Sequence, residues 1–96
     1  MASYVVLSGF TEQGIRTVKE TAKRANKFRE TAKEMGVTIK EIYWTLGRYD
    51  VVVTLEAADD ETVARLMMKM GALGNLKSET LRAFSEEEIG GIVSRI

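Results

Sequence analysis

The stretch 37–57 constrains the fold more than any other part of the chain. Two runs rich in β-branched and aromatic residues, 37–46 and 49–57, flank Gly47-Arg48, and glycine at the first central position suits a two-residue hairpin turn. Because side chains alternate along a strand, this turn predicts one wholly apolar face and one mixed face. The residues predicted on the apolar face are Ile42, Trp44, Leu46, Tyr49, Val51 and Val53.

The segment before the hairpin follows a strand and then a helical pattern. The apolar run Tyr4–Leu7 predicts a strand over 3–10 that is buried on both faces. Thr11 suits the cap of a weak first piece of helix, and a stronger helix is predicted over 21–35. The apolar stripe of that helix comprises Ala22, Ala25, Phe28, Ala32 and Met35.

The segment after the hairpin repeats this order. The acidic triplet 59–61 suits a helix start, and apolar residues continue at helical spacing to Gly71. A fourth strand is predicted over 76–84, and Ser85 then suits the cap of a short final helix. The apolar positions of these two helices are Val63, Leu66, Met67 and Met70 in the first, and Ile89, Ile92, Val93 and Ile96 in the second.

These elements predict an α+β fold for residues 1–96 as a single domain. The order βαββαβ, with two similar βαβ halves, is typical of the ferredoxin-like arrangement: a four-stranded antiparallel sheet with two covering helices. The short C-terminal helix is added to that plan. Two helices cover only one sheet face, whereas two strands are apolar on both sides. We therefore expect a homodimer or higher oligomer, in which a second copy covers the other face; the alternative is that the final helix folds back over it.

Composition excludes several classes of function. The chain has no cysteine and no histidine, which excludes disulfides, thiolate nucleophiles and the usual protein ligands of zinc and haem iron. Lys+Arg and Asp+Glu both number 14, so the basic excess of a nucleic-acid-binding protein is missing. No targeting signal or membrane span is recognisable, so we expect a cytoplasmic location. Because cysteine and histidine are missing, we also expect no metal and no cofactor.

The mixed face of the hairpin holds the candidate ligand site. Tyr43, Thr45 and Asp50, with Glu41 and Thr54 beside them, would line a partly closed cavity if a partner covers this face. The alternative is that they form interface hydrogen bonds or contact solvent.

Charged residues near the turn extend this site. Arg48 suits a carboxylate or phosphate, and Asp50 suits a general base; alternatively they form a turn salt bridge, or Asp50 binds backbone amides. Arg82 would neutralise an acidic ligand or pair with Asp50 or Glu79, and Trp44 would be a core residue or a stacking platform. The predicted ligand-binding residues are Tyr43, Thr45, Arg48, Tyr49, Asp50 and Arg82.

The signature Gly47-Arg48-Tyr49-Asp50 resembles that of the GYD domain family. The resemblance also includes the stretches 4–7, 10–15, 43–53, 73–75 and 79–84. It implies a ferredoxin-like fold related to the dimeric α/β barrels, and it implies little about function. The hairpin signature is also similar, more weakly, to the effector-binding domain of the Lrp/AsnC regulators, which binds small ligands at subunit interfaces.

Three functions remain open at this point. The first is a homo-oligomeric small-molecule-binding or regulatory module. The second is a cofactor-independent enzyme of the isomerase, dehydratase or monooxygenase type, acting on a small carbonyl or aromatic substrate. In it Asp50 would be the base, Tyr43 the proton donor and Arg48 or Arg82 the oxyanion stabiliser. The third is a structural assembly subunit.

Overall fold

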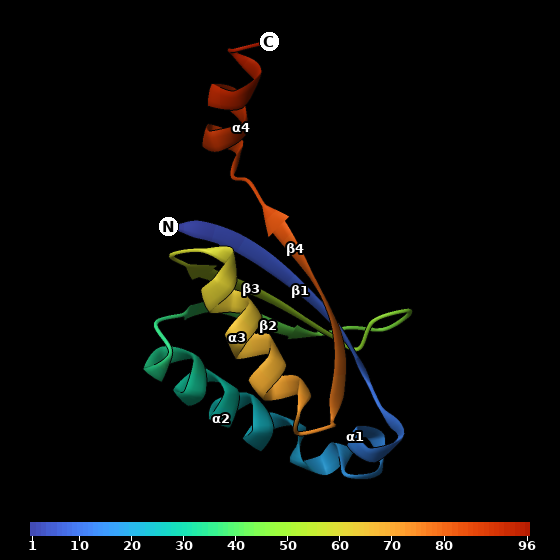
Figure 1. Cartoon of the computed structure of the whole chain (residues 1–96). Helices are drawn as coiled ribbons and strands as arrows, with labels where there is room; N and C mark the ends of the chain where they lie inside the picture. The colour runs from blue at the N-terminus through green and yellow to red at the C-terminus, as the bar shows by residue number, and fades with distance from the viewer.

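The computed structural model describes the whole chain, Met1–Ile96, as a four-stranded antiparallel sheet with helices on one face (Figure 1). Its elements are β1 (Ala2–Phe10), α1 (Glu12–Arg16), the 3₁₀ helix η1 (Val18–Glu20), α2 (Thr21–Glu34), β2 (Thr38–Trp44), β3 (Val51–Ala57), α3 (Asp60–Gly71), β4 (Leu76–Ala83) and α4 (Glu86–Val93). The strand order β2-β3-β1-β4 confirms the predicted ferredoxin-like α+β fold. None of the helices is both long and apolar enough to cross a lipid bilayer.

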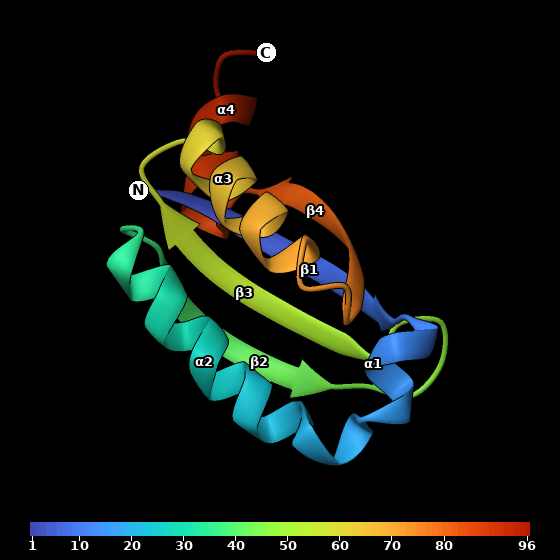
Figure 2. The same ribbon diagram turned by 60° about the horizontal axis from the view of Figure 1, so that its bottom comes forward.

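The core lies between the sheet and the two long helices. Along β3 every second residue is buried, from Val51 to Ala57, because α2 and α3 cover one face of the sheet (Figure 2). In β1 the same alternation buries Tyr4 and Val6, whereas Val5 and Leu7 on the opposite face are only half-buried. The predicted burial of β1 therefore holds for one face only, since no element of the chain covers the other.

The hairpin has the predicted register but not the predicted turn. Trp44 pairs with Val51 and Ile42 with Val53, and the register shifts at Lys40. The strands end earlier than a two-residue turn requires, and the connection 45–50 is irregular. Leu46 is fully exposed instead of facing the core. The physical reason is that Asp50 bonds to β1, its N–H donating to the Ser8 carbonyl at 2.8 Å.

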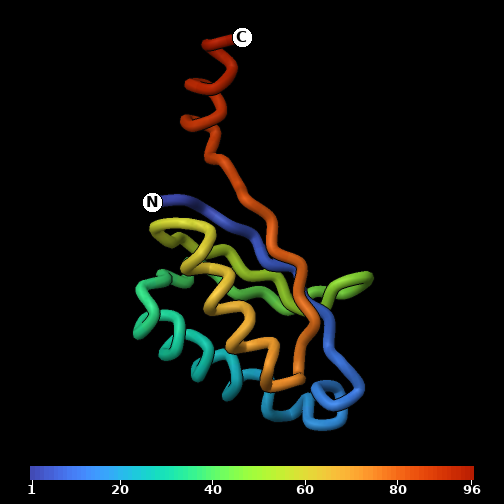
Figure 3. The backbone as a smooth tube through the Cα atoms, in the orientation of Figure 1, coloured from blue at the N-terminus to red at the C-terminus, as the bar shows by residue number.

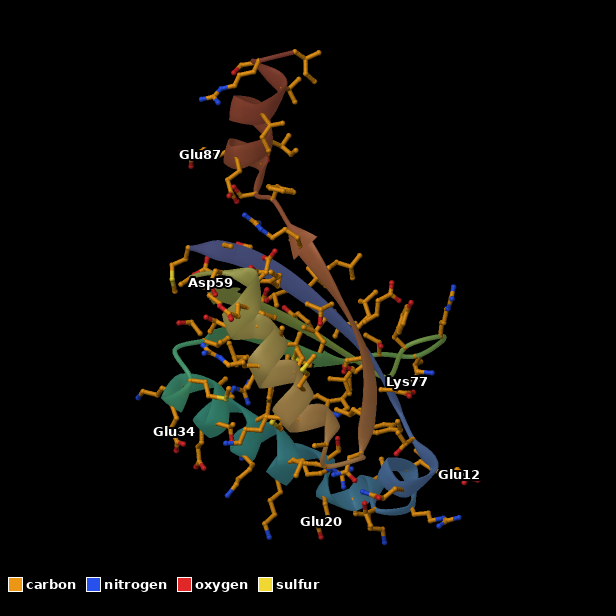
Figure 4. The ribbon with its side chains drawn as sticks, viewed as in Figure 1. Glu12, Glu20, Glu34, Asp59, Lys77 and Glu87 are labelled. Carbon is orange, nitrogen blue, oxygen red and sulfur yellow. The ribbon has the colours of Figure 1, made fainter.

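The helices begin at the predicted caps, but α4 ends at Val93, so Ile96, predicted on its apolar stripe, lies outside the helix. Asp59 caps α3, its carboxylate accepting from the Thr62 N–H at 2.9 Å, and Figure 4 labels it at the start of that helix. Because Thr62 donates from both its hydroxyl and its N–H, the pKa of Asp59 is lowered. In α2 the apolar stripe holds except at Ala22, which is exposed, and Gly36 ends the turn with a φ of +80°.

The C-terminal helix α4 does not fold back over the sheet. It continues outward from the end of β4 and stands away from the body, as the trace in Figure 3 shows. The Cα radius of gyration is accordingly 14.4 Å, against about 13 Å for a compact domain of about 100 residues. Its apolar side chains Ile89, Ile92 and Val93 are between 44% and 52% exposed.

Candidate functional site

The sheet face opposite α2 and α3, here called the open face, has an apolar centre and a polar rim. Two rows of paired residues cross it. One runs Tyr43, Val52, Leu7, Glu79 and the other Glu41, Thr54, Val5, Leu81. The middle of each row is half-buried and mostly apolar, while the outer strands carry the charged and phenolic groups.

The β2 side of this rim is a hydrogen-bonded cluster. The Tyr43 hydroxyl donates to Glu41 Oε2 at 2.5 Å, and the Thr54 hydroxyl lies 3.4 Å from Glu41 Oε1. The bond to the Glu41 carboxylate raises the pKa of the Tyr43 phenol. The phenol therefore stays protonated at neutral pH and donates, and its side chain is 53% exposed.

The connection 45–50 supplies the other end of the rim. The Thr45 hydroxyl donates to the Tyr49 carbonyl at 2.6 Å, which fixes the bend of the connection. The Tyr49 hydroxyl reaches Glu79 Oε1 on β4, at 3.2 Å, so Tyr49 does not oppose Leu46 as the turn predicted. The Arg48 guanidinium carbon lies 5.7 Å from the centre of the Tyr49 ring.

Asp50 binds backbone rather than another charged side chain. The Phe10 N–H donates to its Oδ2 at 2.9 Å, just beyond the last β1–β3 pair, Ser8 and Val51. The carboxylate thus supplies the acceptor that the sheet no longer provides. This arrangement matches the alternative in which Asp50 binds backbone amides.

Arg82 lies far from the other predicted site residues. It pairs with Tyr4 across β1–β4, at the end of the sheet opposite Asp50 and on the helix-covered side. Its guanidinium donates to the carbonyls of Ser3 and Ala83, lies over the Phe84 ring and pairs with Glu88 at 3.9 Å. The predicted pairing with Asp50 or Glu79 is therefore wrong, because Glu88 is the acidic partner.

The structure thus brings some predicted residues together and separates others. Tyr43 shares the open face with Thr54 and Glu41, and Arg48, Tyr49 and Glu79 form a second group. Asp50 is engaged with β1, and Arg82 is not on this face. No group of three or more acidic side chains comes together as a metal site.

The sequence reasoning missed a cavity on the helix-covered side. It has a volume of about 110 Å³ and lies between α2, α3 and the sheet. Trp44 stands at its edge, 45% exposed, with its indole N–H donating to the Thr21 hydroxyl at 3.0 Å. One signal was available: Ser8 follows Tyr4 and Val6 on the buried alternation of β1, and a buried hydroxyl there needs a partner.

Three separate stretches meet at the end of the sheet beside this cavity. The Thr11 N–H and hydroxyl donate to the carbonyls of Asn75 and Gly74, and Gly14 packs against Asn75. Asp50 holds Phe10 at the same corner. These contacts explain why residues near positions 10–15, 50 and 73–75 form one unit.

The chain is similar in sequence to a curated relative and to the model of a protein family. A curated relative, the glutamine synthetase and cystathionine beta-lyase binding protein of Thermus thermophilus, is 36% identical over 84 residues. The match covers 86% of this chain and 88% of the relative. The GYD domain matches residues 4–93, a range that includes all three stretches of the corner described above. The chain therefore belongs to the GYD domain family.

Proposed function

We propose that the chain is a homo-oligomeric regulatory module in which a second copy covers the open face and the assembly binds a metabolic enzyme. The observation that carries this proposal is the uncovered apolar centre of the open face, where Val5, Leu7, Val52 and Leu81 lie side by side. Leu81 is the most exposed of the four, with 41% of its surface accessible. A contiguous apolar surface with a polar rim is the usual form of a protein interface.

The position of α4 supports the same proposal. A helix of this length with Gly90 and Gly91 in its middle is weak in isolation. It nevertheless carries a complete capping box, in which Ser85 and Glu88 exchange hydrogen bonds. Its apolar stripe needs a surface, and its own sheet does not supply one (Figure 4, where the labelled Glu87 stands clear of the body).

The relative from Thermus thermophilus supports an enzyme as the partner. Its name states that it binds glutamine synthetase and cystathionine beta-lyase. Binding is favoured over catalysis because the proposed base and proton donor are already engaged, Asp50 with the Phe10 N–H and Tyr43 with Glu41, and because Arg82 lies at the other end of the sheet. Binding to an enzyme, rather than turnover, is therefore the activity proposed for this chain.

The oligomer is tested by solution mass. Leu81→Lys places a charge on the open face and should reduce the mass to that of a monomer by light scattering. Met68→Lys is the matched control, because Met68 is 77% exposed on α3 and away from that face. A wild-type chain that is monomeric at all concentrations would refute the oligomer.

The enzyme partner is tested by titration. The chain is added to the glutamine synthetase and the cystathionine beta-lyase of its own organism, and binding and enzyme activity are both recorded. We expect saturable binding to one of them with a change in its activity. Absence of binding to both enzymes by an intact oligomer would refute the regulatory role and leave the structural subunit.

A further inference from the structure

The cavity on the helix-covered side arises from unequal packing of the two long helices. At one end Ala32 of α2 and Leu66 of α3 are fully buried against the sheet. At the other end the lining residues of the helices include Ala25 and Gly71, which are too small to fill the space. These small residues leave an open pocket of about 110 Å³ between the helices and the sheet. Figure 2 shows β3 in view between α2 and α3.

The wall of this cavity is mostly apolar and includes the hydroxyls of Ser8, Thr21 and Ser78. Val6, Phe28, Val53 and Met67 are among its hydrocarbon lining. The hydroxyls of Ser8 and Ser78 lie 2.8 Å apart, and Ser8 is only 3% exposed. Each of these two hydroxyls has the other as its partner, so a hydrocarbon group beside them leaves neither without a hydrogen bond.

The rim of the cavity is positively charged. Arg24 and Lys27 lie one helical turn apart on α2, and both line the opening. The chain's ion pairs, Lys40–Glu56 and Arg82–Glu88, include neither of them. Arg24 donates to the Gly14 carbonyl and the Thr17 hydroxyl, which fixes its guanidinium near the opening and leaves further N–H donors. Both cations also line a polar surface hollow with Glu20 and Glu30, but no acidic side chain lines the cavity itself, so the cavity complements an anion with an apolar body.

We propose that this cavity binds a short monocarboxylate, with its hydrocarbon body between α2 and α3 and its carboxylate at Lys27 and Arg24. The volume suits a branched aliphatic chain rather than a nucleotide or a fused ring. The proposal does not rest on the oligomer, because the cavity and the open face lie on opposite sides of the sheet. It also differs from the site predicted on the mixed face of the hairpin.

Trp44 gives a direct readout of this site. It is the chain's single tryptophan and lines the cavity, so its emission reports on the occupant. Isovalerate is titrated into the full chain, and isovaleramide, which has the same body without the charge, is the matched ligand. We expect a saturable change with isovalerate at about millimolar concentration, as a ligand of this size allows, and at least tenfold weaker binding of the amide.

Two variants test the geometry. Lys27→Gln should weaken the binding of isovalerate about tenfold. Lys33→Gln removes a cation from the same helix away from the cavity and should leave the affinity for isovalerate unchanged. Ala25→Leu fills the cavity and should abolish binding without lowering the melting temperature. No saturable change with isovalerate, equal affinity for the amide, or full binding by Ala25→Leu or by Lys27→Gln would each overturn the proposal.

Discussion

At the scale of single residues, the family signature Gly47–Asp50 connects β2 to β3 and also bonds the start of β3 to β1. Asp50 accepts the Phe10 N–H where the β1–β3 pairing ends, and its own N–H extends that pairing by one bond to Ser8. Gly14 allows α1 to lie directly on the backbone of Asn75. A close backbone contact accounts for Asp50 and for Gly14, so neither needs a catalytic role to explain its presence.

Gly14→Ala should destabilise the fold. A Cβ built at this position lies 2.0 Å from the Asn75 carbonyl oxygen, so either α1 or the start of β4 must shift. We expect a loss of about 2 kcal/mol in the free energy of unfolding, measured by urea titration. Gly90→Ala is the control, because nothing lies within 4 Å of its added Cβ. An unchanged midpoint for Gly14→Ala would mean that this contact carries no constraint.

Substitutions of Asp50 separate its backbone role from a catalytic one. Asp50→Ala leaves the part-buried Phe10 N–H without an acceptor and should cost about 1–2 kcal/mol in the free energy of unfolding. Asp50→Asn keeps an oxygen at the same place and should recover most of that stability. The measurement is again urea unfolding, with the Phe10 amide exchange rate recorded by NMR. Equal destabilisation by Asn and Ala would contradict a role based on this hydrogen bond.

At the scale of elements, sequence patterns within one segment predicted the strand register and the helix caps, which depend on residues close in sequence. The register of β2 on β3 followed from the position of Gly47, and the caps Thr11, Asp59 and Ser85 followed from residue type. The cavity between α2 and α3 did not follow, since it depends on how two helices diverge over the sheet. Its hydroxyl pair joins Ser8 to Ser78, and the corner joins Gly14 to Asn75; no pattern within a single element reports such contacts.

The capping box of α4 should make this helix sensitive to acid. The Ser85 N–H and hydroxyl hold the pKa of the Glu88 carboxyl below its ordinary value. A group with a lowered folded pKa stabilises the helix above its ordinary pKa and loses that contribution as the pH falls through the folded value. We therefore expect faster amide exchange in α4 as the pH falls from about 6 to about 3, after correction for the intrinsic exchange rate.

The matched control is Glu88→Gln, which keeps the capping oxygen but does not titrate. Its α4 amides should show no extra pH dependence over the same range. The same acid sensitivity in Glu88→Gln would assign the effect to another group. Ser85→Ala, by contrast, should speed exchange at every pH because it removes the cap itself.

At the scale of the whole molecule, the two sides of the sheet differ in what covers them and in what they could bind. The helix-covered side contains the core and the proposed carboxylate site, while the open face and α4 present apolar surface outward. The ladder β2-β3-β1-β4 joins them, so Val51 and Val53 face the cavity while Val52 between them faces the open side. A ligand in the cavity and a partner on the open face would therefore be separated only by the thickness of the sheet.

The proposed assembly makes the melting temperature depend on protein concentration. A second copy binds only the folded chain, so dilution should lower the melting temperature of the wild type. Ile92→Glu places a charge on the apolar stripe of α4, where the side chain is 46% exposed and contributes little to the fold of one chain. If α4 packs on the second copy, this variant should lose the concentration dependence and melt at the temperature of the dilute wild type. Ile15→Glu, a comparable change at a side chain that is 51% exposed on α1, should keep it. Calorimetric scans over a wide range of protein concentration measure both, and an Ile92→Glu variant that still melts like the concentrated wild type would place α4 outside the interface.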